Sequence, residues 1–260
     1  MLLTDGNPNT TEDLRVYESA ILDVANTEQI DLDAKLGLAT EELSQEVLDM
    51  LLDHTRALDP QLGVLQWNMR RQIGVSDVVV TRQMKRWHAA HTLAVVYRDA
   101  FNNQLNDRYQ AKFTEYRDVA NDAKTHTVRY GIGLSLTPLA KAMAPVVSFA
   151  AVQQAAATYF IQVAWVSAQG QEGEVSDSTS FDAAAGSVPV VSVVNPPSGA
   201  TGFNVYMGLS SVAATLQNAT AVPVAQSFTL PSTGLVSGRA PGNGQNPDVY
   251  VTGGPMLRRG

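Results

Sequence analysis

The sequence predicts an α+β multidomain protein, with an N-terminal antiparallel helical bundle over residues 1–145 and a β-sandwich over residues 146–252. Residues 1–145 contain 35 charged residues and 6 glycines, whereas residues 146–260 contain 8 charged residues and 13 glycines. Near residue 145 the apolar residues also change their spacing, from every third or fourth residue, as in helices, to every second residue, as in strands. Two domains of different secondary-structure class produce such a change, and 260 residues suffice for both.

Four stretches of the first half repeat apolar residues at helical spacing. Their expected ranges are about 12–24, 40–59, 81–103 and 105–123. Threonine or asparagine precedes the first stretch, acidic residues follow in its first turn, and Pro60 ends the second stretch. Short connections between such helices favour an antiparallel bundle, although the last two stretches could also form one bent helix.

The second half alternates apolar and polar residues, which is typical of strands. The strand candidates are TYFIQVAWVSAQGQEG, SVPVVSVV, GFNVYMG, AVPVAQSFTL and DVYVTGG. Segments rich in proline and glycine separate them, as in β-sandwiches. We expect a hinge between Pro138 and Pro145, and an extended tail over residues 253–260.

The composition excludes several classes of protein. The net charge of −7 argues against a free nucleic-acid binder, and the absence of cysteine excludes disulfides and thiolate sites. No apolar run approaches the roughly 18 residues of a membrane span, so no membrane association is expected. The N-terminus lacks the basic and apolar regions of a signal peptide.

Charge is unevenly distributed within the first half. Residues 1–59 carry a net charge of −11 and residues 60–145 a net charge of +6. These segments could neutralise each other within one monomer, or mark opposite faces in a ring. Five acidic residues recur at intervals of three or four along one predicted helix face: Glu41, Glu42, Glu46, Asp49 and Asp53. This face could be exposed to solvent, form a channel wall that repels DNA, or contact a neighbouring subunit.

Few residues form a pattern that carries chemistry. His88 and His91 share a helix face and could hold a metal ion, but no third ligand is evident, so packed histidines are favoured. The Gly131-Ile132-Gly133 segment lacks the third glycine and the preceding strand of a dinucleotide fold. We therefore expect no catalytic residue, no metal and no cofactor.

Two basic segments are candidate contact sites. Arg70 and Arg71 follow Trp67, and three further cations open the third helix: Arg82, Lys85 and Arg86. They could contact phosphate, but ion pairs with the acidic segment or with an acidic partner protein are favoured. At the C-terminus, two apolar and two basic residues are predicted to bind a partner: Met256, Leu257, Arg258 and Arg259.

Several of these stretches resemble known virion proteins. TRQMKRWHAAHTLAVVYRDAFNNQLNDRYQAKFTEYRDVAND and the acidic EDLRVYESAILDVANTEQIDLDAKLGLATEELSQEVLDMLL resemble the head–tail adaptor (connector) proteins of tailed bacteriophages. ATGFNVYMGLSS and ATLQNATAVPVAQSFTLPSTGLVSG resemble the fibronectin type III-like modules of phage structural proteins.

The resemblance implies a structural protein of the virion, assembled in the bacterial cytoplasm. Adaptors form a ring, commonly a dodecamer, that binds the portal protein, contacts tail or nozzle proteins and continues the DNA channel without binding DNA specifically. One alternative is a tail-fibre or decoration protein whose fibronectin III/Ig-like sandwich binds a receptor or glycan. The other is an enzyme with an accessory β-domain.

Overall fold

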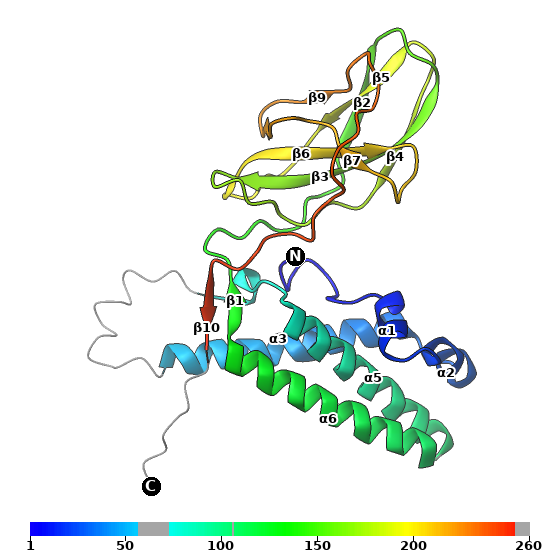
Figure 1. The fold of residues 1–260 in the computed structure, drawn as a ribbon, viewed down its shortest axis with the longest axis vertical. Helices are drawn as coiled ribbons and strands as arrows, with labels where there is room; N and C mark the ends of the chain where they lie inside the picture. The colour runs from blue at the N-terminus through cyan, green and yellow to red at the C-terminus, as the bar shows by residue number, and fades with distance from the viewer. Residues whose placement is uncertain (57–72, 106, 253–260) are drawn as a thin grey trace. The chain divides into compact units, whose positions relative to one another are not determined.

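The computed structural model describes residues 1–56, 73–105 and 107–252 (Figure 1). The chain is mixed α+β, with helices in its N-terminal part and antiparallel strands mainly in its C-terminal part. It divides into two compact units. The helical unit contains Gly6–Ser135 and the residues from Pro247 onward, and the β unit contains Met1–Asp5 and Leu136–Asn246.

The helical unit begins with two short helices and continues with three long ones. They are α1 (Thr11–Tyr17), α2 (Ile21–Glu28), α3 (Leu32–Arg56), α5 (Arg82–Gln104) and α6 (Asp107–Tyr130), with a 3₁₀ turn, η1 (Val75–Asp77), before α5. The side chains of Thr10 and Thr81 cap α1 and α5 by accepting hydrogen bonds from backbone N–H groups. The predicted helix over residues 81–103 is confirmed.

The other helices differ from the expected ranges. The stretch over residues 12–24 is interrupted, because α1 ends at Tyr17 and α2 begins at Ile21. Helix α3 begins at Leu32 instead of near Thr40, since the Asp31 carboxylate accepts hydrogen bonds from two backbone N–H groups of its first turn. Helix α6 extends to Tyr130, seven residues beyond the expected end.

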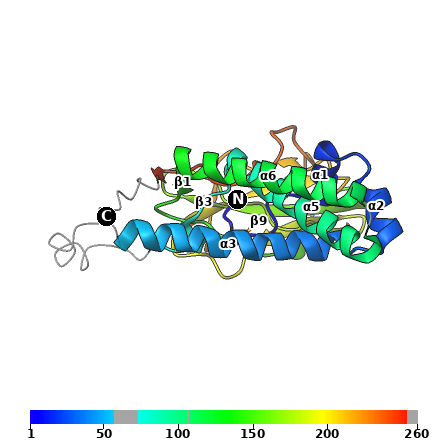
Figure 2. The same cartoon turned by 90° about the horizontal axis from the view of Figure 1, so that it is seen from below.

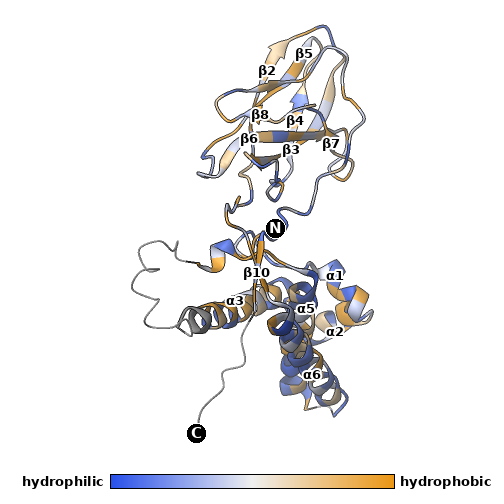
Figure 3. Cartoon of the chain, turned by 60° about the vertical axis from the view of Figure 1, so that its left-hand side comes forward, coloured by the Kyte–Doolittle hydropathy of each residue, from blue (hydrophilic) through white to orange (hydrophobic). Residues whose placement is uncertain are grey.

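Helix α5 is the centre of the helical unit. Figure 2 shows α3 along one side of this unit and α6 along the other, and α5 contacts both. Buried residues cover most of α5, including Leu93 and Val96, whereas α6 is mainly hydrophilic (Figure 3). Helix α6 buries residues at helical spacing, namely Tyr116, Ala120, Ala123 and Thr127.

A buried polar network joins the N-terminal segment to α3 and α5. His88 is fully buried, and its Nδ1 lies 2.9 Å from the Asn9 amide nitrogen. Its Nε2 lies 2.9 Å from the Thr40 hydroxyl and 3.2 Å from the Leu36 carbonyl oxygen. Asn9 also donates to the Lys85 carbonyl. Both ring nitrogens of a neutral imidazole are thus satisfied, as burial requires.

A two-stranded sheet brings together distant parts of the helical unit. Strand β1 (Ile132–Leu134) pairs antiparallel with β10 (Val249–Val251), so that Gly133 lies opposite Tyr250. On its other edge, β1 bridges to Val78, and the Val79 amide donates to the Gly133 carbonyl. Strand β1 is therefore the middle element of this small assembly, and all its residues are buried.

The division of the chain differs from the expected boundary at residues 145/146. Residues Leu136–Asn246 form an insertion between β1 and β10, and Met1–Asp5 belongs to the β unit. The Asp5 carboxylate accepts hydrogen bonds from the backbone N–H groups of Leu2 and Lys141, and Leu2 and Leu3 are buried. The strand in DVYVTGG was expected in the sandwich, but it pairs within the helical unit.

The β unit contains two antiparallel sheets. One has the order β2 (Val146–Ala151), β5 (Ser187–Ser192), β9 (Phe228–Thr229). The other has the order β4 (Thr179–Ala183), β3 (Ala157–Ser167), β6 (Ala200–Gly208), β7 (Thr215–Leu216), and β8 (Val222–Pro223) also pairs with β6. The expected strands within residues 158–208 are confirmed, whereas β2, β4 and β7 come from stretches without a clear alternating pattern.

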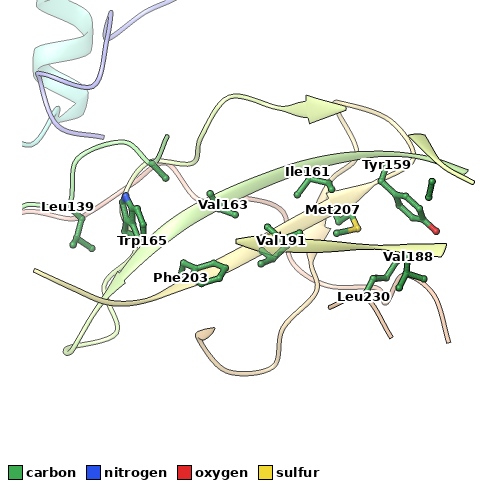
Figure 4. Close-up of a cluster of buried hydrophobic side chains, with 13 residues drawn as sticks. Leu139, Tyr159, Ile161, Val163, Trp165, Val188, Val191, Phe203, Met207 and Leu230 are labelled. Carbon is green, nitrogen blue, oxygen red and sulfur yellow. The ribbon is translucent and has the colours of Figure 1, made fainter. Parts of the chain in front are cut away.

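Side chains from both sheets share one hydrophobic core. Figure 4 shows Ile161 and Val163 of β3, Met207 of β6 and Val191 of β5 in a single cluster. Leu139 is fully buried in the same cluster. The segment between Pro138 and Pro145 is therefore packed against the β unit, and the expectation of a hinge there is wrong.

The close approach of β1 to the segment before β10 predicts the effect of a substitution at Gly133. A Cβ atom at Gly133 would lie 2.6 Å from Cγ of Pro247, whose ring cannot move aside without shifting the backbone. We expect Gly133→Ala to lower the free energy of unfolding by about 1–3 kcal/mol, measured by denaturant titration.

Gly37→Ala is the matched control. Gly37 lies inside α3, and nothing lies within 4 Å of the position of an added Cβ. Alanine there should raise the free energy of unfolding by about 0.5–1 kcal/mol, because it restricts the unfolded chain. If Gly133→Ala also stabilised the protein, the tight contact with Pro247 would be refuted.

Burial of His88 predicts a loss of stability in acid. Burial lowers its pKa from 6.5 to about 4, with a smaller contribution from the nearby His91 and an opposing one from the Leu36 carbonyl. Below pH 6.5 the unfolded chain binds a proton that the folded chain does not, so stability falls as the pH falls towards 4. The full loss is about 3 kcal/mol.

His88→Gln removes this titration. We expect the variant to be less stable at pH 7 by roughly 1–3 kcal/mol, because the polar network loses contacts, but to lose less stability between pH 6.5 and 4 than the wild type. Equal slopes for His88→Gln and the wild type would contradict the assignment.

Candidate functional site

The two histidines considered as metal ligands have separate partners. His88 uses both ring nitrogens in the buried network, whereas His91 Nε2 lies 2.5 Å from the Glu42 carboxylate on α3. Within the described ranges, no group of three or more histidine, cysteine or acidic side chains is placed to hold a metal ion. His88 connects α5 to α3 and to the N-terminal segment, and His91 connects α5 to Glu42 of α3.

The two glycines considered as a nucleotide motif have structural roles. Gly131 has a φ of 99°, and its N–H bonds to the Thr127 carbonyl at the end of α6. Gly133 lies in β1 against Pro247. A strand follows this segment, whereas a phosphate-binding loop opens a helix.

The acidic and basic segments of the helical unit pair within one monomer. The Glu18 carboxylate lies 3.0 Å from Lys112 Nζ and 2.9 Å from the Tyr116 hydroxyl, and the Glu46 carboxylate lies 2.6 Å from Lys124 Nζ. Burial raises the pKa of Glu18, but the bonds from Lys112 and Tyr116 outweigh it and the pKa is lowered. The expected neutralisation between the two segments is therefore present.

The acidic run of α3 does not form one free face. Glu42 and Glu46 point towards α5 and α6, where they pair with His91 and Lys124. Glu41 and Asp49 are exposed, and no described cation pairs with either. The side chain of Asp53 lies outside the described part of the chain. The run thus splits into residues that join helices and residues that face solvent.

A groove with a basic rim lies between the start of α5 and the end of α6. It has a volume of about 220 Å³ and is lined by Gln83, Arg86, Ala123, His126 and Tyr130. The His126 and Tyr130 rings stack with centroids 5.8 Å apart, and Tyr130 is 59% exposed. Sequence reasoning identified Arg86 but missed the groove, because the lining residues come from two distant stretches.

Three arginines near this groove have no acidic partner in the described part of the chain. Arg82 lies one turn before Arg86 on α5, and Arg129 lies next to Tyr130 on α6. All three are exposed, and among the described side chains no carboxylate pairs with any of them. Their charge is therefore available to a partner. Trp67, Arg70 and Arg71 lie outside the described residues.

The C-terminal residues predicted to bind a partner also lie outside the described residues. These are Met256, Leu257, Arg258 and Arg259. The last described element before them is β10, which ends at Val251.

The β unit contains a charged cluster that the sequence did not reveal. The Glu172 carboxylate accepts hydrogen bonds of 2.5 Å each from the Tyr206 hydroxyl and from Arg239, and one of 3.1 Å from Asn204. Arg239 also lies over the Tyr206 ring. Burial, with the hydrogen bond to Glu172, raises the pKa of Tyr206. The cluster is internally satisfied, which fits a role in joining β6 to the flanking loops.

No described helix combines the length and the apolar character needed to cross a membrane.

Comparison with known proteins identifies no relative of this chain. No family model matches the sequence. No curated protein and no solved structure matches it significantly either.

Proposed function

We propose that the chain is a structural subunit of a phage virion, a head–tail adaptor that forms a ring between the portal and the tail. In this proposal the helical unit is a bundle that builds the ring, and the β unit is a fibronectin III-like sandwich. The ring continues the DNA channel, and the chain catalyses nothing and holds no metal or cofactor. The proposal starts from the sequence resemblance to connector proteins.

The observation that carries the proposal is the surface of the two units. Large apolar side chains are exposed on both, including Leu105 and Tyr130 in the helical unit and Phe149 and Val212 in the β unit, of which Val212 is 92% exposed. In an assembled ring, neighbouring subunits cover such side chains, and interfaces are enriched in aromatic residues such as Tyr130 and Phe149. The described titratable groups with strongly shifted pKa values, such as His88, have structural partners, which favours assembly over catalysis.

Charge is consistent with a channel protein. The chain has a net charge of −7, and a wall of this sign repels phosphate. The acidic segment of α1–α3 contributes most of the negative charge. DNA would therefore pass such a ring without being held.

The mass of the protein in solution tests the proposal. We expect a closed ring of about twelve subunits, visible by electron microscopy and by sedimentation at low ionic strength and high protein concentration. A trimer would instead favour the tail-fibre or decoration reading, and a monomer that turns over a substrate would favour an enzyme. Either result would overturn the adaptor proposal.

The tail provides a second test. Deletion of residues 253–260 leaves β10 intact, so the free energy of unfolding should change by less than about 0.5 kcal/mol. Attachment to portal-bearing heads should weaken, because burial of Met256 and Leu257 in a partner contributes roughly 1.5–3 kcal/mol for each side chain.

A second variant separates the two contributions of the tail. Arg258→Ala with Arg259→Ala keeps the apolar pair and should weaken attachment less than the deletion does. Attachment of the deletion variant at wild-type strength would show that the tail does not bind the portal.

A further inference from the structure

We propose that the groove between α5 and α6 binds the exposed face of α3 of a second copy of this chain, in a head-to-tail contact. The inference rests on the proposed function, because such a contact would join neighbouring subunits of the ring. It names the two surfaces of the helical unit that meet.

The first surface is the groove. Arg86 and Tyr130 line it, and Arg82 and Arg129 extend its positive charge at helical spacing. The only described carboxylate paired with a groove-lining residue is Asp122, which lies 3.4 Å from His126. The groove and its rim therefore keep a positive charge, although the whole chain is acidic.

The second surface is an acidic stripe on α3, formed by Glu41, Gln45, Leu48 and Asp49. These residues recur at steps of four, three and one, and all four are exposed. The opposite side of α3 packs inward through Leu43 and Val47, which are buried. The stripe therefore cannot turn towards the groove of its own chain.

The two surfaces match in charge, chemistry and length. The stripe carries two carboxylates and the groove region three arginines, and none of these five has an oppositely charged partner among the described residues. Each surface also exposes an apolar side chain, since Leu48 is 37% and Tyr130 59% exposed. At about 1.5 Å per residue, the stripe from Glu41 to Asp49 spans about 12 Å, and the groove wall from Ala123 to Tyr130 spans about 10 Å.

A copy of the same chain fits the groove better than nucleic acid does. Binding to a DNA backbone requires an extended basic surface, whereas this positive charge is confined to one groove on a chain of net charge −7. A carboxylate-bearing helix brings less negative charge and adds an apolar contact, which suits the mixed lining. Arginine also forms paired hydrogen bonds with carboxylates.

The two surfaces use different residues, so the contact is heterologous. When two subunits pair in this way, one keeps a free groove and the other a free stripe, so the contact repeats until a ring closes. A self-complementary patch would stop at a dimer. The arrangement thus fits a ring of many copies.

Charge reversal tests the contact. One variant carries Arg86→Glu and Arg129→Glu, and another carries Glu41→Lys and Asp49→Lys. All four positions are exposed, so both variants should fold, as circular dichroism can verify. We expect each variant alone to assemble at least roughly tenfold more weakly than the wild type, because like charges then face each other.

Mixing the two variants is the decisive measurement. In a mixture, the unchanged acidic stripe of the Arg86→Glu, Arg129→Glu variant can bind the unchanged basic groove of the Glu41→Lys, Asp49→Lys variant. The lysine-bearing stripe of the second variant can likewise bind the glutamate-bearing groove of the first. Assembly should therefore return. Arg98→Glu is the matched control, because Arg98 is exposed on α5 and does not line the groove. It should assemble like the wild type.

Each outcome decides between readings. If the wild type forms a ring and the reversed variants do too, the groove contact is wrong and the adaptor proposal stands. If the variants fail and their mixture also fails, the pairing of these two surfaces is wrong. A wild type that remains monomeric would refute the ring and this contact together. If Arg86→Glu with Arg129→Glu weakens binding to a DNA duplex, measured by fluorescence anisotropy, and leaves assembly unchanged, the groove is a nucleic-acid site.

Discussion

The pairing of β1 with β10 is the constraint on which the organisation of the chain depends. It holds Leu134 opposite Val249, so the residues where the chain enters and leaves the long β insertion are fixed close together. A domain whose ends are joined in this way can be inserted without disturbing the unit that carries it. Gly133 permits the pairing, because a side chain there would meet Pro247. The β unit is thus an insertion in the helical unit and not an appended domain.

Within the helical unit, polar contacts fix the orientation of helices that apolar packing alone leaves free to slide. His88 connects α5 to Thr40 of α3 and to Asn9 of the N-terminal segment, and every ring nitrogen is used. Since a buried polar group without a partner is costly, alternative registers of α3 against α5 are disfavoured. The ion pairs of Glu18 and Glu46 reinforce the same arrangement at the surface, where each contributes little alone.

The sequence revealed elements that depend on local signals and missed those that depend on distant partners. Helix α5 was predicted because its apolar stripe is continuous. The break between α1 and α2 was missed because the apolar spacing continues across it, with no proline or glycine between Tyr17 and Ile21. The alternation of apolar and polar residues identified Val249–Val251 as a strand. This alternation carries no information about which other strand it pairs with. The groove was missed for the same reason, since Arg86 and Tyr130 meet only after folding.

Internal pairing also determines which charges remain unpaired among the described residues of the helical unit. The acidic segment contains more carboxylates than cations, and Lys112 and Lys124 of the basic segment neutralise part of this excess. The residues that remain unpaired in the described part of the helical unit include carboxylates on the outer side of α3 and arginines at the α5–α6 groove. Exposed charges are screened over about 8–10 Å at physiological salt, so these residues act only at contact distance. The acidic stripe of one copy attracts the basic groove of another, whereas like faces repel each other. The folding of one subunit therefore leaves charges of opposite sign at the two surfaces that the proposed contact would join.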